Sequence, residues 1–195
     1  TFLTVSEEEA ADARRLRIHR QAVAVGNGRD PALFFPDAAD RAAVRAELGV
    51  AEGEVVVLAA ARLVRHKGWP ELLEAAAAVP GLHLWCVGER LPSDHGEDLA
   101  PHFARARHVM GDRLRALGYR HDVARLLRGA DLFCLPSFFE GLPMSIIEAM
   151  LSGLPVVATD IRGSRELVTA ETGLLVPPGQ VAPLAAALER LAGDG

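Results

Sequence analysis

The apolar residues of this chain gather in short runs that alternate with longer segments of helical periodicity. Runs of five or six residues, rich in Val, Leu and Ala, predict β-strands at residues 55–60, 82–87, 113–117, 131–136, 154–159 and 172–176. The segments that follow them contain good helix formers and predict helices at residues 69–79, 97–107, 122–130, 143–153, 164–168 and 181–192. Strands that alternate with helices are typical of βαβ units. The chain is therefore predicted to be an α/β protein, with a Rossmann-like parallel sheet and helices on both faces.

The expected strand order predicts where a ligand would bind. In Rossmann-like sheets, ligands bind outside the carboxyl ends of the strands, at the point where the strand order reverses. If the order is 3-2-1-4-5-6, the loops after the first and fourth strands line that crevice. These loops are ARLVRHKG, residues 61–68, and SFFEGLP, residues 137–143.

The first 22 residues stand outside this alternation. TFLTVS predicts a strand and EEEAADARRLRI a polar helix, without further units that would pair with them. Residues 21–36, QAVAVGNGRDPALFFP, then lead into the main pattern.

Composition and charge narrow the class of protein. The chain has 195 residues, 50% of them hydrophobic, which suits one folded domain with a substantial core. Its net charge of −5 gives no general attraction to nucleic acid or to anionic membranes. No apolar run approaches the roughly 20 residues of a transmembrane helix, and the N-terminus lacks a signal-peptide pattern, so we expect a cytoplasmic protein.

The cysteines and histidines do not predict a metal site. Cys86 and Cys134 lie in apolar runs, which favours buried, unpaired thiols. The seven histidines lack the short paired spacing of zinc ligands. There is also no Asp-x-Asp pair to hold a divalent ion. No Gly-x-Gly-x-x-Gly motif follows the first strand, which argues against an NAD-dependent dehydrogenase.

A cluster of basic side chains follows the first strand of this acidic protein. Arg62, Arg65, His66 and Lys67 fall within six residues. Arginine can hold two oxygens of one phosphate and lysine adds a mobile charge, so the cluster favours a phosphate or diphosphate ligand. The alternative is a solvated surface loop, since basic residues are common at exposed strand ends.

A helix start is expected on the other wall of the crevice. Pro143 suits the first helical position, which leaves the N–H groups of Met144, Ser145 and Ile146 free to face a ligand. Such a helix start favours negative charge by about 0.3–1 kcal/mol. Together with the basic loop it would form a diphosphate clamp, in which protein charges stabilise a leaving diphosphate.

Two carboxylates flank this helix start, Glu140 before it and Glu148 eight residues later. They would repel a diphosphate unless each held a neutral group rich in hydroxyls, and a ribose and a hexose satisfy that condition. Glu148 could then hold the ribose and Glu140 the transferred sugar. The alternative, that both are exposed surface acids, stays open on spacing alone.

These segments together resemble the C-terminal half of the retaining glycosyltransferases of family 4, which have the GT-B fold. The resemblance is carried by RLVRHKG at 62–68, by LGYRHDVARLLRGADLFCLPSFFEGLPMSIIEAMLSGLPVVATDIRGSRELV at 117–168 and by TGLLVPP at 172–178. GNGRDPALFFP at 26–36 resembles the hinge segment that follows the family's N-terminal domain. The resemblance covers residues 20–192.

The resemblance implies a donor-binding domain for a nucleoside diphosphate sugar, without a cofactor or a metal ion. By position, Arg62 and Lys67 match the pair that contacts the diphosphate, Glu140 the acid near the transferred sugar and Glu148 the acid on the ribose. Arg62, Lys67 and Glu140 are the implied catalytic residues. The other implied donor-binding residues are Gly141, Leu142, Pro143, Met144 and Ser145 in the phosphate-binding turn, and Tyr119, Arg120 and Asp122 near the base.

Several features depart from the family pattern or have no assigned role. Gly26 and Arg29 stand where the family more often has proline and a β-branched residue, and Ala61 replaces a glycine. Residues 89–103, ERLPSDHGEDLAPHF, form a longer insertion, which we expect to be a solvated surface loop. Glu166 matches a recurrent family acid whose role the sequence does not reveal.

The chain is too short for the two Rossmann-like domains of a GT-B enzyme. We therefore expect residues 1–22 to be a remnant of the interdomain junction or N-terminal domain, and residues 23–195 to be the nucleotide-sugar-binding domain. The missing N-terminal domain would bind the acceptor, a sugar or a lipid-linked molecule. Membrane association of the full-length enzyme is left open.

The sequence thus predicts a hexosyltransferase that acts with retention and without a metal, of a kind used in polysaccharide biosynthesis. The isolated domain should turn over little or nothing. A sugar-nucleotide epimerase of the same fold and a non-catalytic nucleotide-sugar-binding module are the alternatives. The module is disfavoured because a scaffold has no need of Arg62, Lys67, Glu140 and Glu148 together.

Overall fold

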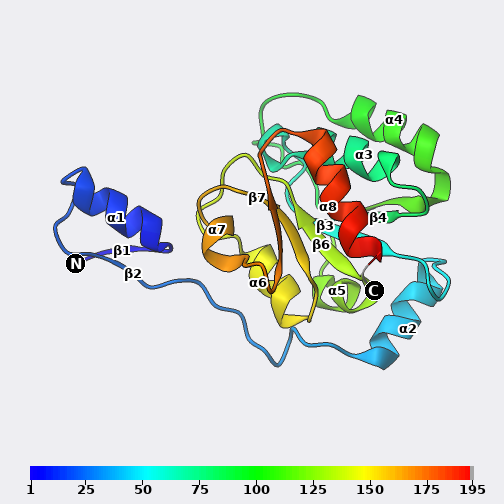
Figure 1. Cartoon of the computed structure of the whole chain (residues 1–195), viewed down its shortest axis with the longest axis horizontal. Coiled ribbons are helices and arrows are strands. Elements are labelled where there is room, and N and C mark those ends of the chain that lie inside the picture. The colour runs from blue at the N-terminus through cyan, green and yellow to red at the C-terminus, as the bar shows by residue number, and fades with distance from the viewer. Residues whose placement is uncertain (194–195) are drawn as a thin grey trace.

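The six predicted strands form a single parallel sheet in a computed structural model of the chain, which describes residues 1–193 (Figure 1). They are β3 (Val56–Ala60), β4 (His83–Val87), β5 (Leu114–Gly118), β6 (Leu132–Leu135), β7 (Val156–Thr159) and β8 (Gly173–Val176). The order across the sheet is β5-β4-β3-β6-β7-β8, and all neighbouring strands are parallel. In chain order this is 3-2-1-4-5-6, which confirms the predicted fold class and strand order.

Helices cover both faces of the sheet. One face carries α3 (Trp69–Ala78), α4 (Ala100–Met110) and α8 (Val181–Gly193), and the other carries α2 (Ala38–Glu47), α5 (Val123–Gly129) and α6 (Met144–Leu151). Successive strand residues point to opposite faces, so Val57 and Ala59 of β3 join the first core cluster, and Val56 and Leu58 join the second. The short helix α7 (Ser164–Leu167) and the 3-10 turns η1 (Arg65–Lys67) and η2 (Gly111–Arg113) lie in the connections.

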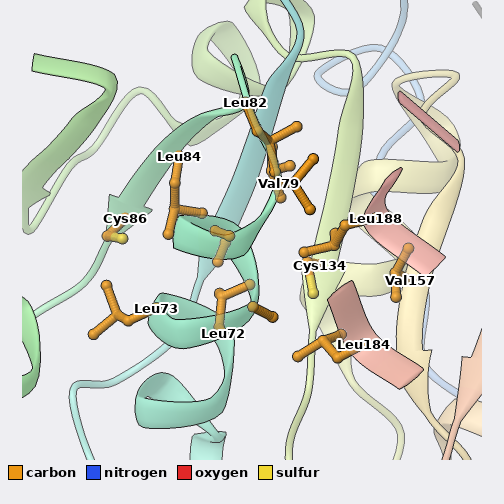
Figure 2. Close-up of a cluster of buried hydrophobic side chains, with 14 of the residues drawn as sticks. Leu72, Leu73, Val79, Leu82, Leu84, Cys86, Cys134, Val157, Leu184 and Leu188 are labelled. Atoms are coloured by element: carbon orange, nitrogen blue, oxygen red, sulfur yellow. The ribbon is translucent and has the colours of Figure 1, made fainter. Parts of the chain in front are cut away.

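The core beneath α3 and α8 contains both cysteines. Figure 2 shows Leu72 of α3 and Leu184 of α8 in this core with Cys86 and Cys134. Both thiols are buried and free, and burial raises the pKa of each above its usual value. The prediction of buried, unpaired thiols is confirmed.

Helix α2 is absent from the predicted elements. Asp37 caps it by accepting a hydrogen bond of 2.9 Å from the amide of Asp40. Val44 in this helix packs against α5, where a Cβ at Gly129 would lie only 2.1 Å from the Val44 side chain. An aspartate before an alanine-rich segment is a helix-start signal, so this helix could have been found from the sequence.

The helix expected at residues 97–107 begins later, at Ala100, and ends at Met110. Pro101 lies in its first turn, where the missing N–H of proline has no intrahelical partner to lose. Residues 97–99 therefore belong to the loop that precedes the helix.

The first residues form a small unit of their own. β1 (Phe2–Thr4) and β2 (Ala22–Ala24) pair in parallel, and α1 (Glu7–Arg15) connects them. The expected strand and helix are present, but they have a partner strand, which corrects the expectation of unpaired elements. β2 runs past the expected boundary at residue 22, and residues 194–195 of the expected domain 23–195 lie outside the described residues. In Figure 1 this unit lies beside α7, and an extended segment joins it to α2.

We expect Gly88 to be required for the close approach of the loops after β3 and β4. Its φ is +140°, and a Cβ at this position would lie 1.9 Å from the carbonyl oxygen of Ala61. Gly88→Ala should therefore lower the free energy of unfolding by about 2–4 kcal/mol. Gly53→Ala is the matched control, because Gly53 has a φ of +84° with open space around it, and it should cost about 1–2 kcal/mol. Equal losses in denaturant unfolding would contradict this prediction.

Candidate functional site

The loops after β3 and β6 meet at the carboxyl edge of the sheet, as the strand order predicts. The amide of Phe138 donates to the carbonyl oxygen of His66 at 2.8 Å, so the two loops are hydrogen-bonded to each other. Gly68 permits this approach, because a Cβ there would lie 2.0 Å from the carbonyl oxygen of Pro136. The basic loop and the segment EGLPMS, residues 140–145 (below, the EGLPMS turn), are therefore adjoining walls of one site.

Lys67, the only lysine of the chain, is paired with Glu140 between these walls. Its Nζ lies 2.7 Å from Oε1 of Glu140, which also accepts a hydrogen bond of 2.6 Å from the hydroxyl of Ser137. The two side chains are only 16% and 11% exposed. A partly buried charge is costly when it is unpaired, so each of these two residues supplies the partner that the other needs.

Arg62 is paired with an acid of the inserted segment 89–103. Its Nη1 donates to Oδ1 of Asp94 at 2.7 Å, and the side chain of Asp94 is almost buried. Oδ2 of Asp94 accepts a hydrogen bond from the amide of Leu91, while Arg90 donates to backbone carbonyl oxygens within the same loop. Residues 89–93 and 95–98 are exposed, as expected of a surface loop, and Asp94 is the residue through which the insertion contacts Arg62.

The other two basic residues of the loop add little charge to the site. Nη1 and Nη2 of Arg65 donate to Glu71 of α3, at 2.9 and 2.5 Å. Burial, and after it the neighbouring cations, lower the pKa of His66, so its imidazole is neutral at pH 7. The positive charge that an anion could reach is therefore that of Arg62 and Lys67.

A hollow of about 460 Å³ opens beside the basic loop. The ring of His66 stacks on Phe139 with 4.5 Å between the ring centroids, and the guanidinium of Arg65 lies 5.0 Å from the centroid of Phe138. Residues of the insertion line the hollow as well. The hollow is therefore lined in part by aromatic rings, and it adjoins the basic loop that carries Lys67.

Helix α6 begins at Met144, so Pro143 is its N-cap and not its first helical residue, which corrects the predicted start at residue 143. The amides of Met144 and Ser145 have no acceptor among residues 1–193, whereas the amide of Ile146 donates to the carbonyl oxygen of Pro143 at 3.2 Å. The sequence predicts three free amides here. The first turn leaves two, because the third already closes a hydrogen bond.

Glu148, on the second turn of α6, is bound by a residue of the hinge segment 26–36. Nε of Arg29 lies 2.5 Å from Oε1 of Glu148, whose side chain is 13% exposed. The side-chain amide of Asn27 donates to the carbonyl oxygen of Leu142 at 3.1 Å. The hinge segment therefore contacts both the EGLPMS turn and the helix that follows it, and no local sequence pattern predicts these long-range contacts.

Two of the three residues that the resemblance places near the base are paired with each other. Nε and Nη2 of Arg120 donate to the carboxylate of Asp122 at 2.7 and 2.6 Å, and these bonds hold the pKa of Asp122 below its usual value. Tyr119 is 59% exposed, and its ring meets His121 edge-on. All three follow β5, so they lie at the same edge of the sheet as Arg62.

Glu166, to which the sequence assigned no role, caps helix α1 of the N-terminal unit. Its two carboxylate oxygens accept the amides of Glu7 and Glu8 at 2.9 and 3.0 Å. The first amides of a helix have no partner within that helix, so an acid there supplies one. Arg165 adds an ion pair to Glu8 at 2.9 Å. Glu166 thus fastens the N-terminal unit to α7.

Neither a metal-ligand cluster nor a membrane-spanning helix is present among residues 1–193. No three His, Cys, Asp or Glu side chains gather there as metal ligands would. None of the helices in the same range has the length and the apolar character that a membrane crossing requires.

Residues 54–194 match the family model described as glycosyl transferases group 1. The chain is 32% identical over 151 residues to the lipopolysaccharide core biosynthesis glycosyltransferase LpsE of Rhizobium meliloti (strain 1021), a match that covers 77% of this chain and 43% of that protein. It is 34% identical over 182 residues to a D-inositol 3-phosphate glycosyltransferase of Mycobacteroides abscessus, with 90% and 40% covered.

Solved structures share the fold. Anabaena Alr3699/HepE in complex with UDP superimposes with a TM-score of 0.89 at 29% sequence identity, over 98% of this chain and 54% of that chain. WaaG, a glycosyltransferase involved in lipopolysaccharide biosynthesis, shares the fold with a TM-score of 0.81 at 21% identity, over 98% and 53%. The chain spans about half the length of the proteins it matches. Its sheet is the Rossmann-like half of a GT-B fold.

Removal of Glu166 should release the start of α1. In Glu166→Ala the amides of Glu7 and Glu8 lose their acceptor, so we expect their hydrogen exchange to become about fivefold faster or more. Mass spectrometry of a peptide that covers residues 5–12 would measure the exchange. Glu171→Ala, which removes an exposed acid elsewhere, is the control and should leave this peptide unchanged. Unchanged exchange in Glu166→Ala would contradict the cap.

Proposed function

Because the chain belongs to the glycosyl transferases group 1 family, we propose that it is the donor-binding half of an enzyme that moves a sugar from a nucleoside diphosphate sugar to an acceptor. The observation that carries the proposal is the pair of Lys67 and Glu140 at the carboxyl edge of the sheet. This pair consists of a cation, which can bind a phosphate, and a carboxylate, which can accept hydrogen bonds from sugar hydroxyls. The similar protein in complex with UDP supports a nucleoside diphosphate as the ligand.

The diphosphate of the donor would replace the acids that now neutralise the two cations. Its oxygens can accept from Nζ of Lys67 in place of Glu140, and from the guanidinium of Arg62 in place of Asp94. The two free amides at the start of α6 add further donors and the positive end of the helix dipole. In this proposal these groups stabilise the charge that grows on the leaving diphosphate, and the reaction requires no metal ion.

Glu140, once released from Lys67, would hold the transferred hexose. Its carboxylate can accept hydrogen bonds from sugar hydroxyls and can stabilise the positive charge of an oxocarbenium-like transition state. The bond between the anomeric carbon and the diphosphate oxygen breaks, and the acceptor oxygen bonds to that carbon on the same face. The proton of the acceptor hydroxyl passes to the departing diphosphate, and the configuration is retained.

The nucleoside would extend from the diphosphate toward Glu148 and the loop after β5. Glu148 accepts from the ribose hydroxyls, because its carboxylate is fixed and only partly exposed. The exposed ring of Tyr119 provides a flat surface on which a base can stack, while Arg120 and Asp122 already satisfy each other.

The acceptor would bind to the part of the enzyme that lies outside this chain. The relatives named above have different activities, one in lipopolysaccharide core biosynthesis and one on D-inositol 3-phosphate, so a sugar, a lipid-linked molecule or a small metabolite fits this role. Both are glycosyltransferases, which favours this function over an epimerase or a non-catalytic module. We propose a cytoplasmic enzyme, polysaccharide biosynthesis as its setting, and an isolated chain that binds donor without turnover.

The reactivity of the Lys67 amine should reveal donor binding. We expect UDP to bind in calorimetric titration and to protect Lys67 from amine acetylation, which peptide mass spectrometry can follow at the only lysine of the chain. Lys67→Ala should raise the Kd for UDP about tenfold or more, since a charge-assisted bond to phosphate is lost. Arg105→Ala, on the exposed face of α4, should leave the Kd unchanged. Failure of the unaltered chain to bind UDP, GDP and ADP would contradict the proposed function.

Removal of the acid on Arg62 should strengthen donor binding. Asp94→Asn leaves the charge of Arg62 uncompensated, so we expect the Kd for UDP to fall about two- to tenfold, more at low salt. Glu97→Gln is the matched control, because Glu97 pairs with Arg65, which is turned toward α3. A Kd for Asp94→Asn that is unchanged or raised would show that Asp94 does not compete with the diphosphate.

A further inference from the structure

The hinge segment places a cation on the carboxylate that the proposed function assigns to the ribose. Arg29 and Glu148 are 119 residues apart in the sequence, yet Nε of Arg29 lies 2.5 Å from Oε1 of Glu148. The side chain of Glu148 is 13% exposed, and that of Arg29 is 41% exposed. The arginine is therefore the more exposed partner of the pair. A β-branched residue at position 29, as in the family pattern, would have no group with which to make this contact.

The pair leaves complementary groups unused. Only Nε of the guanidinium and Oε1 of the carboxylate are joined, and no other partner of either group lies among residues 1–193. Glu148 thus keeps Oε2 as an acceptor, and Arg29 keeps the N–H groups on Nη1 and Nη2 as donors. An acceptor and a donor side by side match two neighbouring hydroxyl groups, because one hydroxyl can donate to Oε2 while the other accepts from the guanidinium.

The anchoring of the hinge segment keeps Arg29 in place. Asn27 donates to the carbonyl oxygen of Leu142 at 3.1 Å, two residues before Arg29. The backbone next to Arg29 is therefore anchored to the EGLPMS turn. This anchor reduces the backbone entropy that would otherwise be lost when Arg29 pairs with Glu148.

We propose that Arg29 and Glu148 form one recognition unit for the vicinal diol of the ribose, in which Arg29 fixes the carboxylate of Glu148 and donates to the second hydroxyl. This inference rests on the proposed function, because it assumes a ribonucleotide in the crevice. It goes further by making a residue of the hinge segment a determinant of nucleotide binding. The segment that connects the N-terminal unit to the sheet then becomes part of the donor site.

The test compares UDP with 2′,3′-dideoxyuridine 5′-diphosphate, which has the same base and diphosphate but no diol. Calorimetric titration of the chain and of Arg29→Val should show a Kd for UDP about tenfold higher in the variant, since one hydrogen bond to the ligand is lost and a second is loosened. The dideoxy nucleotide should bind both proteins equally. Arg29→Lys should recover only part of the affinity. The ammonium group of lysine lacks the planar fork of N–H groups with which a guanidinium can contact the carboxylate and the hydroxyl at the same time. Arg105→Val, on α4, is the control for charge and should match the unaltered chain.

The outcomes separate this inference from the proposed function. If the unaltered chain binds no nucleoside diphosphate, the proposed function fails and this inference fails with it. If it binds UDP and Arg29→Val binds UDP equally well, only this inference is overturned. An equal loss for UDP and for the dideoxy nucleotide would also overturn it, because Arg29 would then act on the diphosphate or on the fold. The combination of Arg29→Val with Glu148→Gln should weaken UDP binding by less than the product of the two single effects.

Discussion

All six strands of the sheet run in one direction, so the loops that follow them lie at one edge. The rest of the site depends on this constraint. It brings the loop after β3 beside the loop after β6, close enough for the amide of Phe138 to bond to the carbonyl oxygen of His66. Two glycines make room for the backbone, Gly68 beside Pro136 and Gly88 beside Ala61. A basic loop and the segment that leads into α6, which are distant in sequence, thereby lie side by side.

The charged side chains of the site are paired with one another. Each of the three cations at the site is held by an acid: Arg62 by Asp94, Lys67 by Glu140 and Arg29 by Glu148. Partly buried charges are costly alone, so the ligand-free site supplies its own counter-charges. Under the proposed function the diphosphate of a nucleotide sugar replaces the acids on Arg62 and Lys67, while Arg29 stays paired with Glu148. The affinity for the nucleotide sugar then reflects the difference between the old pairs and the new ones, not the sum of the new contacts.

Further contacts connect the candidate site to the N-terminal unit. Glu166 binds the first amides of α1, and Asn27 and Arg29 of the hinge segment bind the turn and helix that carry Glu140 and Glu148. In a two-domain GT-B enzyme the reaction takes place between the domains. Residues that hold the segment between them against the donor site would then link the domain arrangement to nucleotide binding.

The sequence by itself determined the strands and their alternation with helices, because these follow from local periodicity. The direction of such strands indicated the edge at which a site would lie, on the assumption of a Rossmann-like strand order that the structure confirms. The sequence prediction missed α2, whose aspartate cap is a local signal, and β2, which has only three residues and is defined by its pairing with β1. Only the tertiary structure decided which acid neutralises which cation. Asp94 and Arg29 lie 32 and 119 residues from their ion-pair partners, and Glu166 lies 159 residues from Glu7, whose amide it accepts. Contacts between such distant residues leave no periodic trace in the chain. The surroundings of the site could therefore not be predicted, although its location could.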